Sequence, residues 1–242
     1  MENFYTINLI DGSEMKLPYN EVTKRSLDEY APKSGNHITF IDDAEYIMKQ
    51  LFENVADKKI TFIDIGANCG LFSLYCSPIC EKIFCIEPTA VLCRTIKEFS
   101  KDIPQIKVSN SAISTQDGTI NFYFFPEVTG QSTIHNRMPA GNSKINLKVQ
   151  SSTLPNFLKK NNLDYVDVVK MDIEGEEVNI FSDKLIDELK DKVGRYWVEC
   201  HHTNHINGMM MEQNYAIITQ RFLSHGYKIH EDLDHYGFIA YR

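Results

Sequence analysis

TFIDIGANCG, residues 61–70, is the stretch that decides the fold. An apolar run typical of a buried strand ends at Asp64, and the chain then turns through Gly66 and Gly70 into a segment with a helical pattern. Glycines let the backbone approach a ligand closely, and the start of a helix presents free N–H groups. A strand, a glycine turn and a helix in this order predict a ligand site at one edge of an α/β sheet.

A second apolar run, residues 82–87, ends in the carboxylate of Glu87. An acid about 20 residues after such a turn can bind ribose hydroxyls. A dinucleotide fingerprint would need a glycine where Asn68 stands, so a pyrophosphate cradle is disfavoured. S-adenosylmethionine, which has no phosphate, fits better. Asn68 contacts this cofactor or caps the following helix, and the spacing favours neither.

Composition excludes several classes of protein. Of the 242 residues, 43% are hydrophobic and 24% charged, as in an ordinary soluble globular protein. No apolar run approaches the ~20 residues of a membrane span, and the first residues do not resemble a signal peptide. A net charge of -8 argues against nucleic acid as a partner. Six cysteines without a C-x-x-C pair predict reduced, buried thiols in a cytoplasmic protein.

No linker or repeat divides the chain, although its first part differs from the rest. Residues 1–57 carry a hairpin-like stretch with a turn at Asp11-Gly12, then a helical pattern over residues 44–56. We expect them to form an N-terminal extension packed on the core, where it shapes the acceptor pocket or a dimer contact. Residues 58–242 are expected to form the core domain.

Strand and helix patterns alternate from residue 59, which predicts a parallel sheet covered by helices on both faces. Two short runs at the C-terminus predict an antiparallel pair, hence a mostly parallel sheet with one reversed strand. Helices are expected over residues 70–79, 90–100, 152–161, 176–190 and 213–225, and strands over 60–64, 82–87, 106–110, 166–173, 194–200, 227–231 and 236–242.

Two alternating runs, residues 119–125 and 144–151, interrupt this order, and a polar loop of residues 126–143 joins them. A connection of this length inside a compact domain is commonly a lid or a substrate loop. We expect Gln131, Ser132 and His135 to contact the substrate, the alternative being an ordinary mobile loop.

Taken together, the order of these segments resembles the class I, S-adenosylmethionine-dependent methyltransferase fold. The segments FIDIGANCG, FCIEP, GQST, VVKMDIEGEE and WVECH together resemble the FkbM-type methyltransferase family over roughly residues 60–201. The resemblance implies an α/β, Rossmann-like, doubly wound sheet of seven mostly parallel strands with one antiparallel strand.

The resemblance also implies roles for individual residues. Ser111 and Ala112 stand where such enzymes contact the adenine, and Asp172 stands beside the methionine part of the cofactor. Pro155 follows Thr153-Leu154 where the family usually has an Asp, which leaves a substrate role there in doubt. The residues implied to hold the cofactor are Asp64, Gly66, Asn68, Gly70, Glu87, Ser111, Ala112 and Asp172.

Polar residues end the two otherwise apolar strands that are expected over residues 166–173 and 194–200. Asp172 and Glu174 lie two residues apart, with Lys170 two residues before them, and Glu199 and His201 repeat the spacing. A hydroxyl acceptor needs a base or a metal ion to remove its proton. We expect His201 or Asp172 to be the base, and Lys170 and Glu174 to orient the acceptor or each other. In the alternative, Lys170 and Asp172 form a structural ion pair and Glu174 complements a helix dipole.

Three histidines, His201, His202 and His205, suggest a metal, but they lack the H-E-x-x-H pattern. If an ion is present, Asp172, Glu199 and His201 are the expected ligands. Glu199 is also a candidate substrate contact.

The resemblance and the strand-tip acids together predict an S-adenosylmethionine-dependent O-methyltransferase that acts on a hydroxyl of a sugar or glycan. The oxygen acceptor comes mainly from the resemblance. Three alternatives stay open: an N-methyltransferase of a small amine or protein, a non-catalytic nucleoside-binding scaffold, and an NAD-dependent oxidoreductase.

Overall fold

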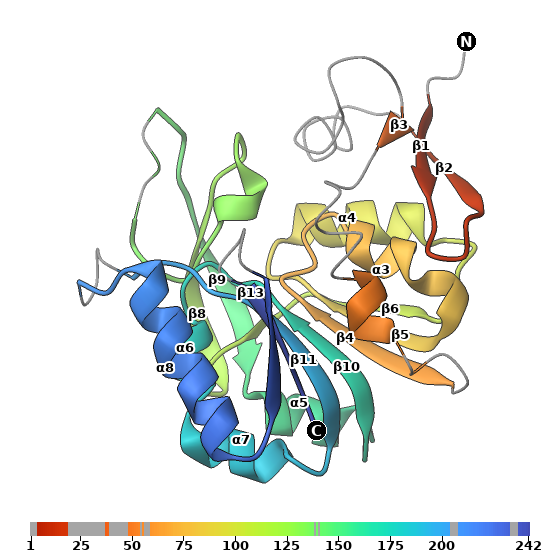
Figure 1. Ribbon diagram of the computed structural model, residues 1–242. Coiled ribbons are helices and arrows are strands. Elements are labelled where there is room, and N and C mark those ends of the chain that lie inside the picture. The colour runs from red at the N-terminus through yellow and green to blue at the C-terminus, as the bar shows by residue number, and fades with distance from the viewer. Residues whose placement is uncertain are drawn as a thin grey trace.

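The computed structural model describes residues 4–18, 37–38, 48–53, 55, 59–137, 139, 141–203, 208–232 and 237–242. Its centre is a seven-stranded sheet with the order β12-β13-β11-β10-β4-β5-β6 (Figure 1). Strands β11, β10, β4, β5 and β6 run parallel, whereas β13 runs antiparallel to both β11 and β12. The predicted fold class, a mostly parallel doubly wound sheet with a reversed strand, is confirmed.

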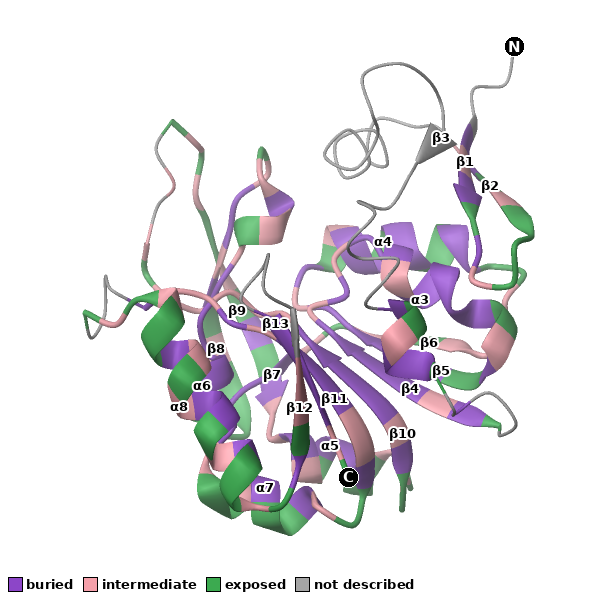
Figure 2. Ribbon diagram, viewed as in Figure 1, coloured by how far each residue is buried: buried purple, intermediate pink, exposed green. Residues whose placement is uncertain are grey.

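Alternation along the strands separates two apolar layers. Phe62 and Val168 belong to one buried cluster, and their neighbours Ile63 and Val169 belong to the other, because successive side chains point to opposite faces. Figure 2 shows the two strands at the centre of the sheet, β4 and β10, buried along most of their length. The strands of the sheet are β4 (Ile60–Ile65), β5 (Cys80–Ile86), β6 (Ile106–Ser109), β10 (Val166–Met171), β11 (Val193–Glu199), β12 (Lys228–Asp232) and β13 (Gly237–Tyr241).

Helices cover both faces of the sheet. On the first face lie α3 (Leu71–Tyr75) and α4 (Ala90–Phe99), whose apolar residues join the cluster of Phe62. On the second face lie α5 (Leu154–Lys160), α7 (Asp183–Leu189) and α8 (Met211–Ser224). No helix in the described part of the chain has the length and apolar character that crossing a bilayer requires.

The N-terminal hairpin packs on the first face. Strands β1 (Phe4–Asn8) and β2 (Glu14–Pro18) pair antiparallel, and β1 also pairs with the short β3 (His37–Ile38). Ile7 and Leu17 are buried in the same cluster as α3, and Ile10 N donates to Tyr75 O at 3.0 Å. Residues 48–52 are helical, within the expected range 44–56. The division of the chain after residue 57 stays a prediction.

The prediction of a single helix over residues 176–190 is wrong, because the helix is interrupted at Phe181 and forms two helices, α6 (Glu177–Ile180) and α7. Ser182 caps α7, its Oγ accepting from Leu185 N at 3.4 Å. Arg221 of α8 donates from Nη1 to Val178 O at 2.7 Å and to Phe181 O at 2.9 Å. These two bonds satisfy carbonyls that an unbroken helix would have paired internally.

The helix expected over residues 70–79 is also shorter. It ends at Tyr75, and a 3-10 turn, η1 (Ser77–Ile79), follows. Pro78 has no N–H to continue the helix, and Ser77 Oγ donates instead to Leu74 O at 2.8 Å. The turn places the chain at the start of β5.

A second sheet lies beside the carboxyl end of the central one. It has the order β7-β9-β8, formed by β7 (Ala112–Ile113), β8 (Gly118–Phe124) and β9 (Ile145–Ser152). The loop between β8 and β9 contains the 3-10 turn η2 (Thr129–Gln131) and, drawn in green, projects from the body of the molecule (Figure 1). It is the loop expected to contact the substrate.

Candidate active site

The site begins where β4 and β10 come together. A Cβ on Gly66 would lie 1.8 Å from Asp172 O, and Asp172 N donates to Ile65 O at 3.1 Å. Gly66 also has a φ of +78°, a conformation that side chains disfavour. The glycine is therefore required both by its conformation and by the close approach of the loop after β10.

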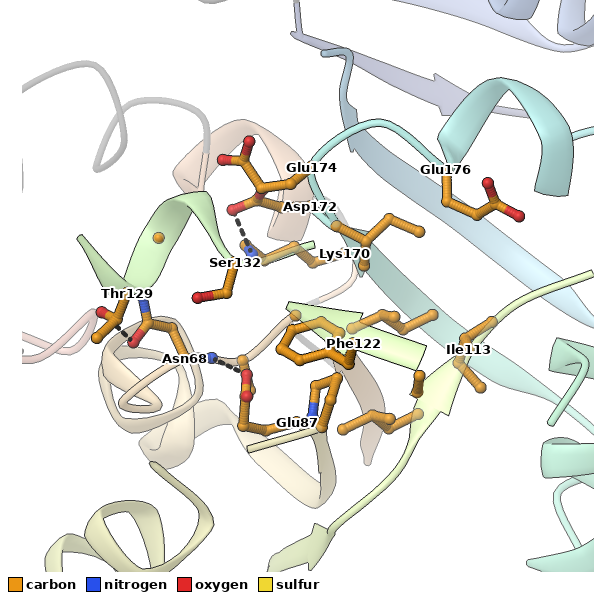
Figure 3. Close-up of a pocket in the computed structure, with 18 of the residues that line it drawn as sticks. Asn68, Glu87, Ile113, Phe122, Thr129, Ser132, Lys170, Asp172, Glu174 and Glu176 are labelled. Atoms are coloured by element: carbon orange, nitrogen blue, oxygen red, sulfur yellow. Dashed lines mark hydrogen bonds and ion pairs between the residues drawn. The ribbon is translucent and has the colours of Figure 1, made fainter. Parts of the chain in front are cut away.

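A pocket opens at this edge, with an empty volume of about 830 Å³ that includes the space open to solvent. Most of the residues expected to bind the cofactor line it, namely Gly66, Asn68, Glu87, Ser111, Ala112 and Asp172. Apolar residues that the sequence did not single out complete the wall, among them Ile113 and Phe122 (Figure 3). An apolar pocket with a few converging polar groups is typical of a small-molecule site.

Glu87 is the acid at one side of this pocket. It is 5% exposed, and it accepts from Asn68 N at 3.1 Å and from Thr89 N at 2.8 Å. Burial raises the pKa of Glu87 to about 7, although these hydrogen bonds act to lower it. Near neutral pH the carboxyl is therefore poised between its charged and neutral forms.

Asn68 joins the glycine turn to the β8–β9 loop. Its backbone is left-handed, with φ +51°, and its Oδ1 accepts from Thr129 Oγ1 at 3.2 Å (Figure 3). Helix α3 begins after Gly70 without a side-chain cap, so the capping role considered for Asn68 is not observed. Thr129 lines the pocket, and its hydrogen bond to Asn68 was not predicted.

Asp64 and Gly70 do not line the pocket. Asp64 is fully buried one layer behind it, where its Oδ2 accepts from Ser73 Oγ at 2.7 Å and its Oδ1 lies 3.6 Å from Lys170 Nζ. Gly70, with φ +82°, leaves room for Ile96, which a Cβ would meet at 3.1 Å. Both residues therefore pack behind the glycine turn and do not border the pocket.

Lys170 is the buried cation of the site. It is 1% exposed, its Nζ lies 3.3 Å from Asp172 Oδ2, and it stands over the rings of Phe72 and Trp197. Burial acts to lower the pKa of Lys170, but Asp172 and Asp64 outweigh it and raise the pKa above its ordinary value. The structural ion pair considered from the sequence is thus present, at a position that also borders the pocket.

Glu177 shapes the loop after β10 and was missed by sequence reasoning. It is 1% exposed, and it accepts from Ile173 N at 3.0 Å, from Gly175 N at 2.9 Å and, through Oε1, faces His201 Nδ1 at 3.0 Å. The signal was an acid at the start of a predicted helix, four residues after Ile173 and two after Gly175, where its carboxylate can accept from their backbone amides. Glu177 therefore fixes the positions of the loop and of His201 together.

His201 is enclosed by carboxylates. Its Nε2 lies 3.4 Å from Glu174 Oε1 and 3.7 Å from both Asp172 Oδ1 and Glu199 Oε1. Burial acts to lower the pKa of His201, but Glu177 and Glu174 outweigh it and raise the pKa well above its ordinary value. The surrounding carboxylates therefore favour the protonated imidazole, the form that has no lone pair with which to accept a proton.

Two further acids face His201: Glu174 from the pocket side and Glu199 from β11. Glu174 lines the pocket in a left-handed conformation, φ +62°, and its Oε2 pairs with Arg137 from the β8–β9 loop. Burial raises the pKa of Glu174, and burial followed by Asp172 raises that of Glu199 to about 8. Glu199 and His201 do not line the pocket themselves but touch its wall through Asp172 and Glu174.

The β8–β9 loop is tied to this cluster at several points. Thr133 Oγ1 donates to Glu174 O at 2.9 Å, and Ser132 lines the pocket. The contact of Ser132 with the substrate stays a prediction. Gln131 does not line it; its carbonyl accepts from Arg137 at 3.3 Å. His135 Nε2 lies 3.5 Å from Glu176 Oε2. His202 lies outside the pocket wall, and His205 lies outside the described residues.

Comparison with known proteins identifies the family. The model of the methyltransferase FkbM domain matches residues 64–229, and no curated protein matches the chain. Two fibrillarin structures are similar to it, one from Methanococcus jannaschii with 13% identity, a TM-score of 0.50 and coverage of 100% of this chain and 94% of the other. The other, from Aeropyrum pernix with natively bound S-adenosyl-L-methionine, has 12% identity, a TM-score of 0.47 and coverage of 99% and 93%.

A third similar structure is a SAM-dependent methyltransferase from Aquifex aeolicus, with 12% identity, a TM-score of 0.46 and coverage of 92% of this chain and 98% of the other. These likenesses concern the fold, whereas the family match spans most of the chain and includes the glycine turn and both strand tips. The chain belongs to the FkbM methyltransferase domain family and is an S-adenosylmethionine-dependent methyltransferase.

Proposed function

We propose that the protein transfers the methyl group of S-adenosylmethionine to an oxygen, a hydroxyl of a sugar or glycan. The observation that carries this proposal is the group of carboxylates beside the cofactor pocket, where Glu174 and Asp172 line the wall. An amine acceptor that binds in its neutral form needs no strong base, whereas a hydroxyl must lose its proton as it attacks. A cluster of acids at the reacting edge therefore favours a hydroxyl.

Glu174 is our candidate for the proton acceptor. Asp172 Oδ2 accepts a hydrogen bond from Lys170, and His201 is enclosed by carboxylates. Glu174 Oε1 lies 3.4 Å from His201 Nε2 but accepts no hydrogen bond from any described residue. In the step, the acceptor oxygen bonds to the methyl carbon as the S–CH3 bond breaks, and the bonding pair stays on sulfur to give S-adenosylhomocysteine. The hydroxyl proton goes to Glu174. Holding the two reactants in line supplies much of the acceleration.

The donor is proposed to lie along the pocket from Glu87 to Asp172. Glu87 accepts from the ribose hydroxyls, Ser111 and Ala112 contact the adenine, and Asp172 lies beside the methionine part. The support is that all four line one pocket, with the left-handed turn at Gly66 between the two acids. Asp64 acts only through Lys170 and Ser73.

The test is methyl transfer from S-adenosylmethionine labelled with 13C in the methyl group, offered to sugars, oligosaccharides and small amines in parallel. The chemical shift of the product methyl distinguishes an O-methyl from an N-methyl group. We expect O-methyl products only, and Glu174→Gln is expected to lower kcat at least tenfold with SAH affinity unchanged. N-methyl products, or full activity in Glu174→Gln, would overturn the proposal.

The affinity for S-adenosylhomocysteine is expected to fall as the pH falls. The pKa of Glu87 in the free protein is about 7, above its ordinary value, and only its carboxylate form accepts from both ribose hydroxyls. Affinity is therefore full above pH 8 and about tenfold weaker at pH 6, since one pH unit below the pKa leaves roughly a tenth of the group charged. Calorimetry at the two pH values checks this. In Glu87→Gln the tenfold ratio should vanish, and an unchanged ratio would contradict the assignment.

Three further proposals concern the whole chain. Residues 1–57 form an extension that shapes the acceptor pocket or a dimer contact, supported by the burial of Ile7 and Leu17 against α3. Residues 58–242 form the catalytic domain. The protein works in the cytoplasm, supported by six buried cysteines, none of which forms a disulfide.

A further inference from the structure

We propose that a divalent metal ion binds between the tips of β10 and β11, held by Asp172, Glu199 and His201. One ligand atom from each of these residues lies within 4.8 Å of the other two. The binding site is argued from these side chains alone, whereas the role of the ion in methyl transfer rests on the function proposed above.

The distances suit one shared ion. His201 Nε2 lies 3.7 Å from Asp172 Oδ1 and 3.7 Å from Glu199 Oε1. Ligands bonded to one ion at about 2.1 Å lie roughly 3 to 3.5 Å apart. These pairs are too long for hydrogen bonds and only slightly longer than ligand pairs, so small side-chain rotations would complete the set.

His201 is oriented as metal-binding histidines are. Its Nδ1 faces Glu177 Oε1 at 3.0 Å, and Glu177 is itself held by the amides of Ile173 and Gly175. A ligating histidine almost always donates its other ring N–H to a carboxylate or carbonyl, which directs the free nitrogen toward the ion. Here Nε2 is directed at the carboxylates, and metal binding would replace its proton.

The hydrogen bonding of Glu199 is a second, independent observation that points to a cation. Its side chain is only 28% exposed, yet no described N–H or O–H group donates a hydrogen bond to it. The same holds for Asp172 Oδ1, since Lys170 reaches only Oδ2. Carboxylate oxygens in such surroundings are normally satisfied, and a cation between the two strand tips would satisfy both.

The charges around the site also favour a cation. Five acidic side chains gather here around only two basic residues other than the ligand His201. The acidic side chains are those of Asp64, Asp172, Glu174, Glu177 and Glu199, and the basic ones are Lys170 and Arg137.

One nitrogen and two oxygen ligands suit a transition-metal ion that accepts both kinds of donor, such as Mn²⁺, better than Ca²⁺, which takes oxygen ligands only. A bound ion would hold the acceptor oxygen and stabilise its negative charge. Glu174, which is not among the three ligands, remains the proton acceptor.

The experiment is a titration of the full chain with Mn²⁺, in which electron paramagnetic resonance measures the free ion, with and without S-adenosylhomocysteine. We expect one ion per chain, and at least tenfold weaker binding in Glu199→Gln and in His201→Ala. Glu188→Gln, an exposed position on α7, is the matched control and should bind Mn²⁺ like the unmodified protein.

Absence of saturable Mn²⁺ binding, or unchanged binding in Glu199→Gln, would overturn the metal site. If His201→Ala does not fold, the conservative Glu199→Gln decides alone. Calorimetric binding of S-adenosylhomocysteine to the same samples separates the two proposals. Cofactor binding without Mn²⁺ binding would overturn the metal site but not the proposed function. Mn²⁺ binding together with methyl transfer to amines alone would overturn the proposed function but not the metal site.

Discussion

Gly66→Ala is expected to abolish measurable binding of S-adenosylhomocysteine and to destabilise the fold by at least about 3 kcal/mol. The new Cβ would lie 1.8 Å from Asp172 O and 2.9 Å from Asp172 C, both backbone atoms that no side-chain rotation can move away. The strand ends of β4 and β10 must therefore separate, which also displaces Asp172 from the pocket. Calorimetry and thermal unfolding measure the two effects.

Gly12→Ala is the matched control for this prediction. Gly12 has nearly the same backbone conformation, φ +83°, but a Cβ there would meet no heavy atom within 4 Å. This substitution should destabilise the fold by only about 1 kcal/mol, the cost of an alanine in the left-handed conformation, and leave cofactor binding unchanged. If Gly66→Ala binds as tightly as Gly12→Ala, the close approach of the two strand ends is not what the pocket requires.

Lys170→Met is expected to cost about 3–5 kcal/mol and to lower the Tm by roughly 10 °C. Lys170 and Asp64 are 1% and 0% exposed, with Nζ and Oδ1 3.6 Å apart, so the variant leaves a buried carboxylate without its cation. The cost is expected to fall when Asp64→Asn is added, because both charges are then removed. Chemical denaturation of the two single variants and the double variant measures this coupling.

Lys190→Met removes the same charge from an exposed pair. Lys190 Nζ lies 2.9 Å from Asp187 Oδ1, but the two side chains are 40% and 60% exposed, so we expect no measurable change in stability. Equal stability of Lys170→Met and Lys190→Met would mean that the buried ion pair contributes nothing to the fold.

The parts of the site that the sequence predicted are those set by local pattern. Gly66 follows an apolar run directly, and Glu87 ends the next one, so strand, turn and acid could be placed without knowing the fold. The ends of neighbouring parallel strands meet at one edge, which is why Asp172 and His201 were expected together. The structure brings them within 3.7 Å.

The parts that the sequence could not predict depend on contacts between distant segments. Arg137 pairs with Glu174, 37 positions away, and Arg221 satisfies the carbonyls that break α6 from α7. The pKa of His201 is raised, against the effect of burial, by Glu177, Glu174 and Asp172, whose distances no spacing rule provides. The strand-tip pattern predicts a histidine beside acids, but the enclosure that favours its protonated form depends on the assembled site.

The hydrogen bond between Thr129 and Asn68 joins the turn beside the donor to the loop beside the acceptor, and so couples the binding of the two ligands. Asn68 belongs to the turn that the donor contacts, and Thr129 belongs to the loop expected to meet the acceptor. Coupling of this kind is reciprocal, so any free energy with which the donor fixes Asn68 also favours the placed loop. The two ligands are therefore expected to bind cooperatively, each raising the affinity for the other by the same factor.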